Sequence, residues 1–173
     1  MIDYPFIILF GLHIIGVVSW FGATILFVSV IEPSLKRMDP DSMKDFMIKV
    51  IPRLARFSIA MSALTLLAGF FLFDYVSTTE PYLLPSPRIL FIYAGGILGF
   101  VAFLVVVTGM LGTSSKLRSA SIPSLPGGSG GVATGESTSA MLGHVAETVR
   151  GTLLASSYLL FAIFVLMVLG ANL

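Results

Sequence analysis

His13 is the residue of this chain whose type and position most directly point to chemistry. It stands about eight residues into an apolar stretch, which places it about 12 Å below one membrane edge if that stretch is a helix. An ionisable side chain at that depth is costly and normally faces the interior of a helix bundle or a cavity. A neutral imidazole there could ligate haem iron or copper, or relay protons. A hydrogen bond to serine or threonine on a neighbouring helix is the alternative.

Arg88 is the second candidate, because it is the only basic residue between the second and third apolar stretches. Its long side chain could reach lipid headgroups, or it could pair with a propionate, a carboxylate or His13. We take His13 and Arg88 as the candidate cofactor-binding residues, with haem b or copper as the candidate cofactor. No catalytic residue is predicted.

His144 and the methionines are weaker candidates for ligands. His144 precedes the last apolar stretch and lies near the opposite membrane face from His13, so one subunit cannot bring both histidines to one metal. A second ligand would have to be methionine, water or a residue of another chain. We expect four methionines, scattered over three segments, to be packing residues: Met61, Met110, Met141 and Met167.

The composition assigns the chain to the membrane. Of its 173 residues, 56% are hydrophobic and only 11% carry charge, against about 25% charged residues in ordinary soluble domains. This excludes a soluble enzyme and a disordered tail, and a net charge of +1 gives no basic field for nucleic acid. The absence of cysteine excludes disulfides and thiolate metal sites, and two histidines exclude a histidine-rich metal cage.

Four stretches are long enough to cross about 30 Å of hydrocarbon: residues 5–31, 54–75, 89–113 and 147–171. Backbone groups inside lipid must be satisfied within the segment, so these stretches are predicted to be helices. The fold class is therefore all-α, a polytopic integral membrane protein whose single domain is a four-transmembrane-helix bundle. We expect the first span to be an uncleaved helix, because it is longer than a signal peptide core and lacks a basic segment before it.

The basic residues predict the orientation. Nine of the ten lie in or beside the first and third loops, and Arg88 alone lies on the other side. The positive-inside rule then places both basic loops in the cytoplasm and both termini outside, in the cell (plasma) membrane.

The two basic loops differ in character. Asp39 is a good N-cap and Pro40 suits the first position of a helix over residues 40–51, whose apolar positions fall on one helical stripe: Met43, Phe46, Met47 and Val50. This predicts a short amphipathic helix in the membrane interface that turns into the second span at Pro52, or, alternatively, a helix that packs on a partner subunit. Residues 114–140 are rich in glycine and serine and predict a flexible loop.

Small residues indicate where helices approach closely. Gly95 and Gly99 form a GxxxG pair, and Ser58 and Ser62 have the same spacing. These pairs argue for a compact bundle, but the sequence leaves open whether the GxxxG face is internal or lies between subunits.

The first span also carries a family resemblance. The segment LHIIGVVSWFG, residues 12–22, resembles the first helix of the copper-resistance protein D (CopD-like) family, and it is similar to that of the four-helix membrane protoporphyrinogen oxidase family. Both families place a histidine a few residues before a tryptophan. The resemblance continues weakly through residues 31–35 and through Arg53-x-x-Arg56-Phe57, and so covers about the first 75 residues.

The resemblance implies roles for both candidate residues. In the oxidase family the helix-one histidine is associated with haem or porphyrin and works with a lysine near the start of helix three. These positions correspond to His13 and to the neighbourhood of Arg88. Because arginine stays protonated, it does not suit the proton-transfer role of that lysine. The oxidase family's basic-histidine motif at the end of helix one is also missing. These departures favour the CopD-like branch, whose members help copper cross or reach the membrane, or a relative that has lost activity.

Three functions remain compatible with these residues. The first is a non-catalytic accessory subunit of a larger membrane complex associated with copper or haem. The second is a stand-alone haem-binding or copper-handling protein that uses His13, and the third is a membrane porphyrinogen oxidase. The expected partners are the lipid bilayer and other membrane subunits or further copies of the chain, with no nucleic acid.

Overall fold

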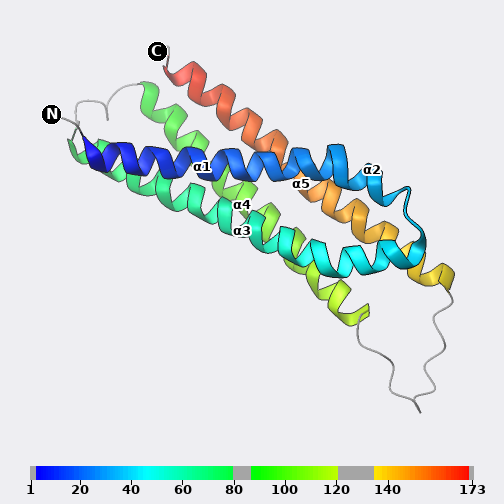
Figure 1. Ribbon diagram of the computed structural model, residues 1–173. Helices are drawn as coiled ribbons and strands as arrows, with labels where there is room; N and C mark the ends of the chain where they lie inside the picture. The colour runs from blue at the N-terminus through cyan, green and yellow to red at the C-terminus, as the bar shows by residue number, and fades with distance from the viewer. Residues whose placement is uncertain (1–2, 80–86, 121–134, 172–173) are drawn as a thin grey trace.

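The computed structural model describes residues 3–79, 87–120 and 135–171, and all the secondary structure in these ranges is helical (Figure 1). In chain order the elements are α1 (Tyr4–Leu26), a π-helical turn η1 (Phe27–Ile31), α2 (Glu32–Leu35), α3 (Pro40–Thr79), α4 (Pro87–Ala120) and α5 (Gly135–Ala171). Within the described residues, four segments are long and apolar enough to cross a membrane: Tyr4–Leu35, Asp41–Thr79, Ile89–Thr113 and Ala140–Leu169. This confirms the predicted all-helical class and its four membrane-length helices.

The first span is continuous because the chain accommodates a proline near its end. Pro33 has no N–H, and its ring crowds the carbonyl one turn earlier. The helix widens into the π-helical turn η1 just before this proline, and the Glu32 N–H donates to the Phe27 carbonyl instead. As a result α1, η1 and α2 form one long rod that carries Glu32 at its far end.

Two antiparallel helix pairs build the bundle. α1 packs along α3, α4 packs along α5, and contacts between α3 and α4 join the two pairs. α1 and α5 lie on the same side of the molecule but meet over only a short length (Figure 1). The bundle is therefore tightly packed within each pair and more open along the α1–α5 side.

Glycines let the paired helices approach closely. A Cβ atom added at Gly16 of α1 would lie 3.0 Å from the backbone nitrogen of Thr65 and closer still to its hydroxyl. In the second pair, Gly109 of α4 lies directly against the side chain of Thr152. At each contact, the absence of a side chain sets the separation of the helices.

The GxxxG pair of α4 faces the inside of the bundle. Gly95 and Gly99 both pack against Ile163 of α5, and Gly99 also contacts Leu66 of α3. Ser58 and Ser62 of α3 are likewise fully buried. Both small-residue pairs therefore serve contacts within the chain.

The expected interfacial helix at residues 40–51 differs in the structure. It is the first part of α3, which continues through Pro52 without a break. The missing N–H of Pro52 removes one hydrogen bond, while its fixed φ remains compatible with a helix. Met47 belongs to the buried core, and Met43 and Phe46 pack against that core. Three of the four apolar side chains of the stripe thus pack in or against the chain's own core.

Asp39 caps the start of α3, as the sequence predicts. Its carboxylate accepts from the Ser42 N–H at 3.0 Å. This hydrogen bond holds the pKa of Asp39 below its ordinary value.

The third loop is shorter than the predicted flexible segment 114–140. α4 extends to Ala120 and α5 begins at Gly135, so helix occupies both ends of that segment. The rest of the loop lies outside the described residues.

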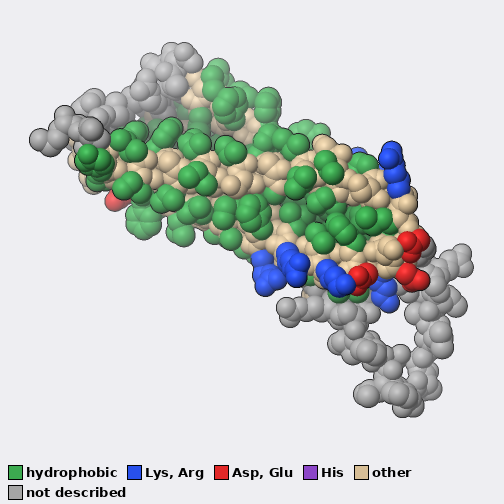
Figure 2. All heavy atoms as spheres, viewed as in Figure 1, with side chains coloured by type: hydrophobic (Ala, Val, Ile, Leu, Met, Phe, Trp, Pro, Cys, Tyr) green, Lys and Arg blue, Asp and Glu red, His purple; other side chains and the backbone are tan. Residues whose placement is uncertain are grey.

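Charged side chains gather toward one end of the molecule, and apolar side chains cover its long sides (Figure 2). Most of the buried core also lies toward the charged end, where Leu35, Met47 and Ile51 pack with Leu142, Val145 and Val149. Trp20, which the sequence places on the same face as His13, is fully buried.

The contact at Gly16 yields a stability prediction. We expect Gly16→Ala to lower the free energy of unfolding by about 1–3 kcal/mol, because the new methyl group meets backbone atoms of Thr65 and Met61 that cannot move aside. Gly22→Ala is the matched control on the same helix, since a Cβ there has nothing within 4 Å. Unfolding of both variants in detergent with increasing denaturant measures the difference. Equal stability of the two variants would contradict the close-contact interpretation.

Candidate functional site

His13 joins α1 to α3 through a hydrogen bond. Its Nδ1 lies 2.9 Å from the backbone carbonyl oxygen of Thr65. A carbonyl oxygen only accepts, so Nδ1 is the protonated nitrogen and donates. The ring packs against Gly69, where an added Cβ would lie 2.9 Å from Nδ1 and 3.0 Å from Cε1. In the neutral ring this arrangement leaves the lone pair on Nε2.

A polar stripe on α3 lines the same helix contact. We use this name for Ser58, Ser62 and Thr65, which are all buried and fall on one helical face. Ser62 and Thr65 donate to backbone carbonyls of their own helix. Among the described residues, the Ser58 hydroxyl and the indole N–H of the buried Trp20 are buried without a hydrogen-bond partner. The interior of the bundle thus retains unused hydrogen-bonding capacity on both α1 and α3.

The described part of the structure does not bring the other candidate residues to His13. Arg88 is the second residue of α4, and its side chain lies outside that part. His144 is exposed on α5, beyond Arg150. Arg150 contacts Glu32, which follows His13 by 19 residues or about 28 Å of helix. The two histidines are therefore far apart, as the sequence predicts. In the described ranges, no three His, Asp or Glu side chains are grouped closely enough to hold a metal ion.

Glu32 forms a buried ion-pair site that sequence reasoning missed. Its side chain is only 10% exposed and forms ion pairs with Lys36 Nζ at 2.9 Å and with Arg150 Nε at 3.4 Å. Lys36 lies one turn along the same helix, whereas Arg150 belongs to α5. A carboxylate removed from water requires such partners. The i, i+4 spacing of Glu32 and Lys36 is a signal that the sequence does contain, but nothing in it indicates Arg150.

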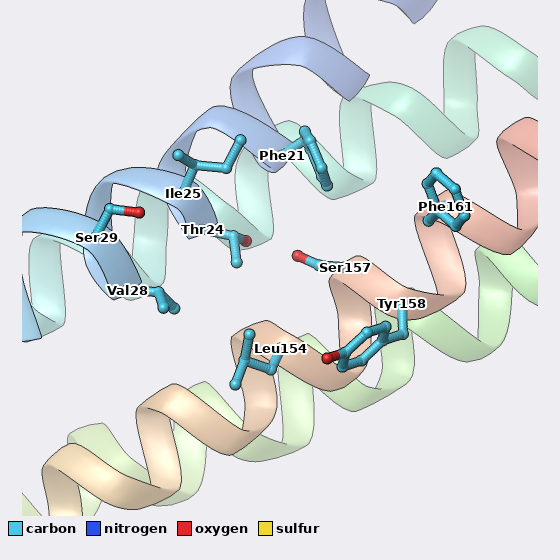
Figure 3. Close-up of a pocket in the computed structure, with 9 residues that line it drawn as sticks. All are labelled: Phe21, Thr24, Ile25, Val28, Ser29, Leu154, Ser157, Tyr158 and Phe161. Carbon is cyan, nitrogen blue, oxygen red and sulfur yellow. The ribbon is translucent and has the colours of Figure 1, made fainter.

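A groove of about 330 Å³ separates α1 and η1 from α5. Four residues of α1 or η1 on one side face four of α5 on the other, and Ser29 closes one end (Figure 3). The lining is mainly apolar: Phe21, Thr24, Ile25, Val28, Ser29, Leu154, Ser157, Tyr158 and Phe161. The hydroxyl of Ser157 points into the groove toward Thr24, and it is buried without a partner among the described residues (Figure 3).

Comparison of the chain with protein-family models, with curated proteins and with solved structures found no match. The class of protein is defined by the described fold itself, an all-helical chain with four helices of membrane-spanning length and apolarity. Within that class, the chain is distinguished by an imidazole bonded across the α1–α3 contact and a buried carboxylate shared by two cations.

The Glu32 site predicts a difference between two ion pairs at the charged end. We expect Glu32→Gln to lower the free energy of unfolding by about 1–3 kcal/mol, because it removes the carboxylate that ties α2 to α5. Asp45→Asn is the matched control: Asp45 pairs with Lys49 at 2.6 Å, but both side chains are about two-thirds exposed. Its expected effect is below about 0.5 kcal/mol. Denaturant unfolding of both variants tests this, and equal losses would show that burial does not distinguish the two pairs.

Proposed function

We propose that this chain is a non-catalytic accessory subunit of a larger membrane complex, one associated with copper or haem. In this proposal it lies in the plasma membrane with both termini outside and its basic loops in the cytoplasm, as the charge distribution favours. Four helices of spanning length support the membrane placement. The association with copper or haem rests on the CopD-like resemblance of the first span.

The observation that carries this proposal is the way ionisable groups inside the bundle are used. His13 bonds the α3 backbone through Nδ1, and Glu32 bonds Arg150 of α5. Each of these contacts joins two different helices. A general acid or base has to be within reach of a substrate proton, whereas these groups are directed at the chain's own helices. Side chains used in this way stabilise a scaffold.

The outer face of α1 offers a surface for a partner helix. Gly11 and Gly22 are eleven residues apart, about three turns, and so lie on one face. A Cβ added at either position would meet nothing within 4 Å. Exposed small residues allow the backbone of a second membrane helix to approach closely. This face therefore supports association with another subunit or a further copy of the chain.

This proposal predicts that Gly22→Leu disrupts the complex. A tagged chain, extracted from the membranes of expressing cells in mild detergent, is expected to elute above its monomer size with co-purifying proteins identifiable by mass spectrometry. Gly22→Leu should shift most of it to the monomer, because the side chain blocks close approach to α1. Gly96→Leu is the matched control, since Gly96 is equally open but lies on α4. A wild-type chain that elutes as a monomer without partners would contradict the proposal.

A second candidate, a haem-binding or copper-handling protein, is favoured by the tautomer of His13. With Nδ1 donating to the Thr65 carbonyl, Nε2 keeps the lone pair that a metal needs. Histidines that bind metals are commonly oriented by such a hydrogen bond from the other ring nitrogen. The donor set fits a single protein ligand, so the remaining positions would be filled from elsewhere.

For this second candidate, we expect purified wild-type chain to carry haem absorbance or about one equivalent of copper, and His13→Ala to lose it. His144→Ala, which changes an exposed histidine, should retain the wild-type content. Visible absorption and metal analysis of the three proteins measure this. Spectra without haem and preparations without copper in all three would refute the candidate and leave the accessory-subunit proposal intact.

A further inference from the structure

We propose that the groove between α1 and α5 binds one anionic phospholipid. An acyl chain would lie in the groove, and the phosphate would lie against Lys36 and Arg150 at its charged end. This inference rests on the membrane placement in the proposed function, but it does not depend on a partner protein or on a cofactor.

The size and the apolar lining of the groove fit an acyl chain. From Phe21 to Ser29 it extends over eight residues, about 12 Å along the bundle. The groove holds about 330 Å³. A flexible, narrow hydrocarbon chain is therefore the occupant that its volume and apolar walls accommodate.

Two basic side chains lie beyond one end of this groove, Arg150 one helical turn and Lys36 about two turns from the lining. On α1 and its extension, Val28 of the lining is followed one turn later by Glu32, and on α5 Leu154 is preceded one turn earlier by Arg150. Lys36 and Arg150 share the single carboxylate of Glu32, so these three side chains together carry one net positive charge, with Glu147 exposed about one turn before Arg150. Their side chains remain 68% and 48% exposed, which leaves N–H groups available to a phosphate. Basic clusters between membrane helices on the cytoplasmic side are typical sites for anionic headgroups.

Ser157 adds a polar contact in the middle of the groove (Figure 3). Its hydroxyl points into the groove and is buried without a partner in the described part of the chain (Figure 3). Ser157 is seven residues from Arg150, about 10 Å along α5. Between its phosphate and its acyl chains, a phospholipid carries ester carbonyl oxygens, which are hydrogen-bond acceptors. The groove therefore presents a hydrogen-bond donor among apolar walls, about 10 Å from a cation, which suits the ester and acyl parts of a phospholipid whose phosphate lies at the charged end.

The test measures lipid binding to the purified chain by native mass spectrometry. The chain in detergent is titrated with phosphatidylglycerol or with phosphatidylcholine of the same acyl composition. We expect the wild type to bind one phosphatidylglycerol at least about fivefold more tightly than phosphatidylcholine. Arg150→Gln should remove most of this preference. Arg53→Gln is the charge-matched control, because Arg53 is exposed on α3 and does not line the groove, and it should retain the preference.

A second pair of variants tests the acyl part of the site. Ile25→Trp adds bulk to the groove from a side chain that is 51% exposed, so it should fold while weakening both lipids several-fold. Leu26→Trp makes the same change at a neighbouring residue that is also 51% exposed but outside the lining, and should bind as the wild type does.

Three outcomes would overturn the proposal. Equal losses in Arg150→Gln and Arg53→Gln would show attraction to overall charge. Unchanged lipid binding in Ile25→Trp would show that the groove is not the site. Conversion of a dimer to a monomer by Ile25→Trp with lipid binding unchanged would assign the groove to a second copy. None of these results depends on whether the chain co-purifies with other subunits, so failure of this inference is separable from failure of the proposed function.

Discussion

The close approach of α1 to α3 at Gly16 is the constraint on which the rest of the bundle depends. With no Cβ at Gly16, the α1 backbone lies against the Thr65 backbone. That separation lets the imidazole of His13, one turn earlier on α1, reach the Thr65 carbonyl. It also buries the polar stripe of α3 between the helices, where lipid cannot reach it. In a bilayer, helices gain little from burying apolar surface against one another, so such fitted contacts carry much of the packing.

The two ends of the molecule are held by different forces. In the apolar half, the pairs α1–α3 and α4–α5 are joined at glycines by shape. Hydrogen bonds from His13 to the Thr65 carbonyl and from the Tyr75 hydroxyl to Asp3, the N-cap of α1, also join the first pair. At the charged end, the large apolar side chains of the core and the ion pairs of Glu32 hold α1, its extension, α3 and α5 together. The Glu32–Arg150 ion pair joins the extension of α1 to α5 at that end, and the groove begins about one turn further along both helices.

Much of this fold could be predicted from the sequence, because apolar stretches of spanning length leave few alternatives to a helix. The separation of the two histidines also followed from spacing along a helix. The continuity of α3 could not be predicted, because the sequence shows the proline at position 52 but not the core on which the apolar stripe packs. The interfacial helix was inferred from an amphipathic pattern that fits a membrane surface and a protein core equally well.

The site was less predictable than the fold, because its contacts join residues distant in the chain. The depth of His13 indicated an interior position, but its acceptor, the Thr65 carbonyl, is a backbone atom that no residue type reveals. The Glu32–Arg150 pair joins residues 118 positions apart, and the groove depends on how two helices diverge. The pairing of His13 with Arg88 stays a prediction.

The length of α3 has a consequence for the medium that surrounds each part of the bundle. A helix of 40 residues is about 60 Å long, roughly twice the thickness of the hydrocarbon layer. If its apolar half spans the bilayer, the half before Phe57 stands in water with α2 and the start of α5 packed around it. There the ordinary hydrophobic effect operates, and its strength changes with temperature and salt. One continuous helix would then link a part stabilised by the hydrophobic effect in water to a part stabilised by close helix packing in lipid. Each part would respond differently to heat and to detergent.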